Sequence, residues 1–214
     1  IRLDSLMMYP DIEMENTHSL DLIQMGVIPD DTAMNQLEGT VKAVILSHGH
    51  LDHIGAVPKL VHRYNAPIIG TPYTIELVKQ QIESEKKFGV SNKLIALKFG
   101  QRYNISNTLS MELVRTQHSI IDTATPVLYT PKGAIVYALD FKLDRNPVLG
   151  EPPDFAKFQK IGKEGVLCLI TESTNVNRKG RCPSEQIAKN MVRDVMTSYE
   201  DDKNAIIVST FASH

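Results

Sequence analysis

The fold of this chain is decided by one stretch, ILSHGHLDHIGAVP, which runs from Ile45 to Pro58. It places three histidines and an aspartate within six positions, although the whole chain has only 7 histidines. The residues just before it, VKAVILS (41–47), form an apolar run rich in β-branched side chains, which indicates a buried strand. The residues after it, IGAVPKLVHRYN (54–65), repeat apolar side chains at helical spacing. The cluster therefore lies where a buried strand turns into a helix.

The spacing within SHGHLDH is typical of metal ligands. His48 and His50 are two positions apart at a strand end, so both imidazoles point to the same side. Asp52 and His53 follow where the backbone turns, so they point elsewhere. One metal does not easily bind all four groups at this spacing, whereas two neighbouring metals can share them. Imidazole and carboxylate ligands without thiolates suit zinc, with manganese or iron as alternatives.

Two further candidate ligands stand at the ends of other predicted strands. His118 ends SMELVRTQH (110–118), and Asp140 ends AIVYALD (134–140). Taken alone, a strand-end aspartate is more often a turn residue or a helix cap. Together with the first cluster, both residues become candidates for the same site.

The rest of the chain alternates predicted strands and helices. We expect strands at APIIG (66–70), KLIALKF (93–99), SMELVRTQ (110–117) and TPVLYT (125–130), a hairpin turn at PKG (131–133), and strands at AIVYALD (134–140), GVLCLIT (165–171) and NAIIVST (204–210). We expect helices through IELVKQQIESEKKF (75–88), capped by Thr71 or Thr74, at about 153–163, and at about 183–199. Cys168 is expected to be buried as a small hydrophobic residue. The order predicts a layered α/β or α+β sandwich with mixed sheets.

Composition narrows the functional classes. With 42% hydrophobic residues, 22% charged residues and a net charge of -2, the chain is expected to fold, and any nucleic acid must bind at a local patch. The two cysteines fit no disulfide framework, which favours a reducing, cytoplasmic compartment. No apolar run is long enough to predict a membrane span.

The order His48-x-His50-x-Asp52-His53, then His118, then Asp140, resembles the metallo-β-lactamase superfamily. The resemblance implies an αββα sandwich and two Zn²⁺ ions, with Mn²⁺ as an alternative. It assigns His48, His50 and His118 to one metal and Asp52 and His53 to the other, with Asp140 bridging both. The family's early Asp-x-Gly motif and late histidine are absent from these residues, so we expect the chain to be a fragment.

Two later residues resemble the motifs of the β-CASP insertion, which marks the nucleic-acid-cutting members of that superfamily. Glu172 ends the strand GVLCLIT, and His214 follows NAIIVST. Each has an ordinary alternative, because Glu172 can be a turn or helix-capping carboxylate and His214 a histidine without a role. The sequence ESTN, a basic loop and Pro-Ser-Glu resemble the archaeal ribonuclease J group. The resemblance implies an incomplete metallo-β-lactamase domain at 1–180 and the start of a β-CASP domain at 181–214.

The implied function is metal-dependent hydrolysis of single-stranded RNA. The expected activity is 5′-to-3′ exonucleolytic on RNA with a 5′ monophosphate, with or without endonuclease activity, in RNA processing and decay. The implied catalytic residues are Asp52, Asp140, Glu172 and His214, the last as a general acid. Arg178, Lys179 and Arg181 either contact RNA phosphates or form a solvated face. We expect a homodimer formed partly through regions outside these residues.

Other activities stay open on the sequence. A β-CASP endonuclease of the cleavage and polyadenylation type, or a DNA-repair nuclease, would use the same metal ligands. A small-molecule metallo-hydrolase would need only the first cluster and its partners. A metal-stabilised RNA-binding module without turnover is an alternative from a different class.

Overall fold

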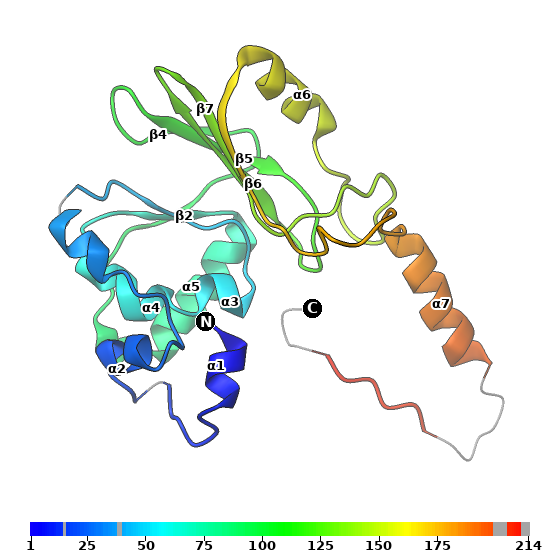
Figure 1. Ribbon diagram of the computed structural model, residues 1–214, viewed down its shortest axis with the longest axis horizontal. Helices are drawn as coiled ribbons and strands as arrows, with labels where there is room; N and C mark the ends of the chain where they lie inside the picture. Colours follow the sequence, from blue (N-terminus) through cyan, green and yellow to red (C-terminus); the bar gives the residue numbers. More distant parts are fainter. Residues whose placement is uncertain (15, 38–39, 199–204, 211–214) are drawn as a thin grey trace.

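The centre of the molecule consists of two β-sheets stacked face to face. The computed structural model describes residues 1–14, 16–37, 40–198 and 205–210 (Figure 1). The first sheet is parallel, in the order β1 (Val44–Ile45), β2 (Ile68–Gly70), β3 (Leu94–Ala96). The second contains β4 (Arg102–Asn104), β5 (Ser110–Arg115), β6 (Ala124–Thr130), β7 (Gly133–Ala138) and β8 (Val166–Thr171), in that order. Its neighbours run antiparallel except β7 and β8, which are parallel.

Helices cover the outer faces of the two sheets (Figure 1). The α-helices are α1 (Leu3–Met7), α2 (Ser19–Gln24), α3 (Leu51–Ile54), α4 (Val57–Leu60), α5 (Pro72–Ser84), α6 (Phe155–Glu164) and α7 (Glu185–Thr197). Short 3-10 helices lie at Thr32–Leu37, Val61–Arg63 and Lys86–Phe88. Helices α3 to α5 pack on the outer face of the first sheet, and α6 packs on the second sheet. Within the described ranges, no helix combines the length and the apolar character that a membrane crossing requires.

Strand alternation creates the layers. In β2, Ile68 packs with the helix residues Ile54 and Val78, whereas the next residue, Ile69, packs between the sheets. In β5, Leu113 joins the layer between the sheets, and its neighbour Val114 packs toward Ile161 of α6. Successive side chains of a strand point to opposite faces, so each sheet contributes to two cores.

The result is a helix–sheet–sheet–helix sandwich, which confirms the predicted α/β class with mixed sheets. The hairpin at Pro131 and Lys132 joins β6 to β7 as expected. Thr71 stands at the N-cap of α5, but its hydroxyl does not cap that helix. Its Oγ1 instead donates to the Asp122 carbonyl at 2.9 Å, which ties α5 to the loop after β5.

Two expectations for the later part of the chain are wrong. Cys168 is exposed, as is every other residue of β8. Residues 205–210 form no strand and are exposed. In both segments the apolar pattern is present, but the described residues supply no layer to cover it. Apolar side chains become buried only where a neighbouring element covers them.

Candidate metal centre

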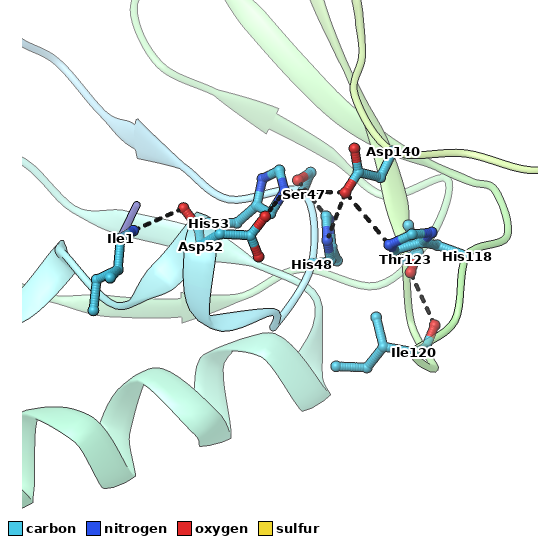
Figure 2. Close-up of polar contacts among 9 residues, drawn as sticks. All are labelled: Ile1, Ser47, His48, Asp52, His53, His118, Ile120, Thr123 and Asp140. Carbon is cyan, nitrogen blue, oxygen red and sulfur yellow. Dashed lines mark hydrogen bonds and ion pairs between the residues drawn. The ribbon is translucent and has the colours of Figure 1, made fainter. Parts of the chain in front are cut away.

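Six side chains from four places in the chain meet at one edge of the sandwich. Figure 2 shows all of them except His50. His48 lies in the loop after β1, and His50 is the N-cap of α3. Asp52 and His53 belong to α3 itself. The others follow the second sheet's strands, His118 after β5 and Asp140 after β7.

One group of ligand atoms comprises the nitrogens of His48, His50 and His118 and a carboxylate oxygen of Asp140, all within 4.8 Å of one another. The rings of His48 and His50 are edge-on, with centroids 4.8 Å apart. The His118 ring lies 5.0 Å from His48 and 4.7 Å from His50. Three imidazoles converging with one carboxylate are a typical donor set for zinc.

A second group comprises Asp52, His53 and the same Asp140, again within 4.8 Å. His53 Nε2 lies 3.5 Å from Asp52 Oδ2 and 3.2 Å from Asp140 Oδ2. Asp140 Oδ2 also lies 3.7 Å from His48 Nε2 and 3.4 Å from His118 Nε2. A single carboxylate oxygen is therefore shared by both groups.

His48 has the chemistry that a metal requires. Its side chain is 0% exposed, and its Nε2 has no hydrogen-bond partner in the described structure. Burial lowers the pKa of His48 to about 2, and repulsion from the three imidazoles around it adds to the effect. The ring therefore stays neutral, which leaves a lone pair for a metal. A buried, neutral, unpaired nitrogen facing a carboxylate fits a divalent cation.

One local and one long-range hydrogen bond hold the loop that carries His48 in place. Ser47 Oγ lies 3.0 Å from His48 Nδ1, a contact that can orient the imidazole ring. When that Nδ1–H donates to the hydroxyl, Nε2 carries the lone pair. The Ala124 N–H donates to the Ser47 carbonyl at 2.9 Å, which joins the loop after β1 to β6.

The loop after His118 is shaped by a residue that sequence reasoning missed. Thr123 Oγ1 donates to the Ile120 carbonyl at 2.9 Å and closes the turn (Figure 2). Gly49 allows α5 to approach from below, since a Cβ there would lie 2.4 Å from Leu77 Cδ1. The Thr123 contact spans only three residues and follows no motif that sequence reasoning used, whereas the role of Gly49 depends on Leu77, which is distant in the sequence.

Glu172 lies at the same edge as Asp140 but outside both ligand groups. β8 runs parallel to β7 with Thr171 opposite Ala138, so Glu172 and Asp140 follow neighbouring strand ends. The Glu172 carboxylate accepts a hydrogen bond from the Thr174 N–H at 2.8 Å. This contact matches the turn-capping alternative for Glu172. His214 lies outside the described residues.

The basic residues Arg178, Lys179 and Arg181 are all exposed in the loop between β8 and α7. They belong to neither ligand group. Their exposure is compatible with an RNA contact and equally with a solvated loop.

Comparison with known proteins gives a family. The model of the metallo-beta-lactamase superfamily matches residues 27–133, which is half of the chain. Ribonuclease J of Methanocaldococcus jannaschii is 54% identical over 214 residues, which cover 100% of this chain and 48% of that protein. Ribonuclease J of Pyrococcus abyssi is 44% identical, over 100% of this chain and 47% of that protein. The chain spans about half the length of these curated relatives.

A solved structure of a metallo-β-lactamase variant from Cronobacter sakazakii aligns with a TM-score of 0.47. It is 12% identical, and the alignment covers 84% of this chain and 70% of that one. The family match covers His48 to His118 of the candidate centre. The chain belongs to the metallo-β-lactamase superfamily, and it is similar to archaeal ribonuclease J throughout its length.

Proposed function

We propose that this member of the metallo-β-lactamase superfamily is the metal-binding part of a ribonuclease that hydrolyses phosphodiester bonds in single-stranded RNA. The proposed activity is 5′-to-3′ exonucleolytic on RNA with a 5′ monophosphate, with an endonuclease activity left to the assay. The similarity to two archaeal ribonucleases J supports the substrate class. The two ligand groups support a metal-dependent reaction.

The observation that carries the proposal is the position of Asp140 Oδ2. This oxygen lies 3.2–3.7 Å from the Nε2 atoms of three histidines that belong to the two groups. A carboxylate shared between two ligand groups is suited to hold two cations close together. Two close divalent metals, Zn²⁺ or Mn²⁺, supply a hydroxide near neutral pH and neutralise charge on a phosphoryl group.

The chain's own residues would bind the two ions and orient the metal ligands. His48, His50 and His118 would hold the first ion, Asp52 and His53 the second, and Asp140 both. Ser47 would keep the His48 ring in its productive orientation through the 3.0 Å contact with Nδ1. Burial around His48 would exclude water from this side of the centre.

The remaining roles are also part of the proposal. His214 would donate a proton to the leaving 3′ oxygen, and Glu172 would orient a nearby histidine. Arg178, Lys179 and Arg181 would contact phosphates. Residues 1–180 would form part of the metallo-β-lactamase domain and 181–214 the start of a β-CASP domain. A homodimer and a cytoplasmic location stay predictions.

The test uses the full-length protein, with Asp140→Asn compared to Asp11→Asn, an exposed aspartate that belongs to neither ligand group. Metal content is measured by mass spectrometry and cleavage by the release of products from 5′-labelled RNA. Asp140→Asn should lose metal and lower cleavage by about three orders of magnitude or more, on the scale of losing a main catalytic group. Asp11→Asn should match wild type in both measurements.

The products separate the candidate activities. Mononucleotides released from the 5′ end support the exonuclease, and internal fragments support an endonuclease. Retention of full metal and activity by Asp140→Asn would overturn its role. Hydrolysis of a thioester or lactam without cleavage of any RNA would replace the ribonuclease with a small-molecule hydrolase.

A further inference from the structure

A pocket of about 630 Å³ adjoins the candidate metal centre. Its wall includes His118, so the pocket and the metal centre share a side chain. The other walls come from the start of α5, the segment after β5, the loop around Glu151 and the start of α7. A volume in this range suits a group of small-molecule size. A substrate whose phosphate reaches the centre would therefore place a neighbouring group in this pocket.

One buried polar atom in the pocket wall lacks a partner. Gln117 is 6% exposed, and its side-chain Oε1 is buried without a hydrogen bond in the described structure. The backbone here is held firmly, because the Lys142 N–H donates to the Gln117 carbonyl at 2.7 Å. Buried polar groups normally find a partner, since leaving one unmet costs free energy. Gln117 also lines the pocket, so a donor that approaches from the pocket and reaches Oε1 would satisfy it.

The charges of the lining select against a phosphate. Three carboxylates, Asp122, Glu151 and Glu185, line the pocket, against the single guanidinium of Arg115. The Arg115 Nε is already engaged, donating to the Pro152 carbonyl at 3.0 Å. An anionic group would be repelled here, whereas an uncharged group with N–H donors would be accepted.

The remaining lining favours a flat, aromatic ligand. Two aromatic residues, Tyr73 and Phe99, line the pocket together with apolar residues such as Ile121. Aromatic side chains bind nucleobases by stacking, independently of base identity. Every nucleobase also carries an amino or imino N–H that a carbonyl oxygen can accept.

We propose that this pocket binds the nucleobase of an RNA nucleotide next to the scissile phosphate, with Gln117 Oε1 accepting a hydrogen bond from the base. This inference rests on the proposed ribonuclease function and adds a binding subsite to it. The phosphate lies at the metal ligands, and the uncharged base enters the acidic, aromatic-lined pocket. In this proposal, Gln117 contacts only the nucleobase of the substrate.

The first experiment needs no variant. The full-length protein is given a 5′-monophosphorylated single-stranded RNA in which an abasic nucleotide is placed at each position in turn. Removing a base adjacent to the scissile phosphate should lower kcat/KM by about 5- to 150-fold, the range of a lost stacking contact. Removing a base several nucleotides away should have a much smaller effect. A flat profile across all positions would overturn the subsite.

The second experiment identifies the contact. Gln117→Met removes the amide and keeps the side-chain length, so the penalty for the adjacent abasic nucleotide should shrink. The matched control is Gln81→Met in α5, because Gln81 Oε1 also has no partner among the described residues and Gln81 does not line this pocket. Gln81→Met should keep the wild-type penalty. An unchanged penalty in Gln117→Met, with metal content intact, would remove Gln117 from the subsite.

A second variant in the same pocket tests the proposal even if Gln117→Met does not fold. Tyr73→Leu removes an aromatic wall from a partly exposed helix start, and it should also shrink the abasic penalty. An unchanged penalty in Tyr73→Leu would count against base stacking. Wild-type protein that cleaves no RNA at all would instead defeat the proposed function, so the two failures are distinguishable.

Discussion

The region around the candidate centre and the region from β8 onward carry the same kind of apolar pattern, yet only the first is buried. Leu113 in β5 is 0% exposed, whereas Leu169 in β8 is 60% exposed. β5 has a strand on each side and a packed layer on each face. Among the described strands, β8 pairs with β7 alone. Periodicity therefore reports which side chains are apolar, and only neighbouring elements make them buried.

Polar residues differ between the two regions in the same way. His48 is enclosed by three other imidazoles and by Asp140. Glu172 instead makes a local bond to Thr174, two residues along the chain. Contacts between distant segments hold a side chain against several partners at once, whereas a local turn contact holds it against one. The comparison predicts that the two regions respond differently to matched changes.

The largest difference should come from truncating one leucine in each region. Leu113→Ala leaves a cavity between the sheets and should lower the free energy of unfolding by about 2–5 kcal/mol. Leu169→Ala removes an exposed side chain and should change it by less than about 0.5 kcal/mol. Urea denaturation of the 214-residue chain measures both. Equal losses would mean that β8 is covered in solution.

Acid should destabilise the metal-free protein through the buried region. The folded protein keeps His48 neutral because its pKa is about 2, whereas the unfolded chain binds a proton below its ordinary pKa of 6.5. The contribution of His48 to the free energy of unfolding is thus fully present above pH 6.5. Below that pH, this contribution falls by up to about 1.4 kcal/mol per pH unit. Unfolding between pH 7 and pH 4.5 measures this slope.

The control for that slope is His48→Gln, which removes the titrating group. The free energy of unfolding of this variant should depend less steeply on pH, because its unfolded state binds about one proton fewer than that of the wild type. An identical slope in His48→Gln and wild type would contradict the assignment to His48.

The smallest effect should come from replacing a serine in each region, one beside a metal ligand and the other beside Glu172. Ser47→Ala removes the partner of His48 Nδ1 and should weaken zinc binding by about 10- to 100-fold. Ser173→Ala, next to Glu172 in the exposed loop, should leave zinc affinity unchanged. Calorimetric titration with Zn²⁺ measures both. Equal affinities for the two variants would show that Ser47 does not orient its neighbour.

The core elements could be predicted because their signals are local. The helix through IELVKQQ and the hairpin at Pro131 follow from spacing and turn chemistry within a few residues. β4 escaped prediction because only Tyr103 of its three residues is apolar, which is too short a pattern to indicate a strand. Cys168 was placed wrongly because its apolar run does not specify a covering layer.

Within the centre, the sequence by itself determined the ligand types and the close spacing of His48, His50, Asp52 and His53. Covalent geometry places residues two to five apart near one another in any fold that turns at this point. Only the tertiary structure decided that Asp140, 87 residues from His53, would direct one oxygen into both ligand groups. The same packing left Gln117 buried beside that centre. Distances between remote segments are set by the packing of whole sheets, which no short stretch of sequence encodes.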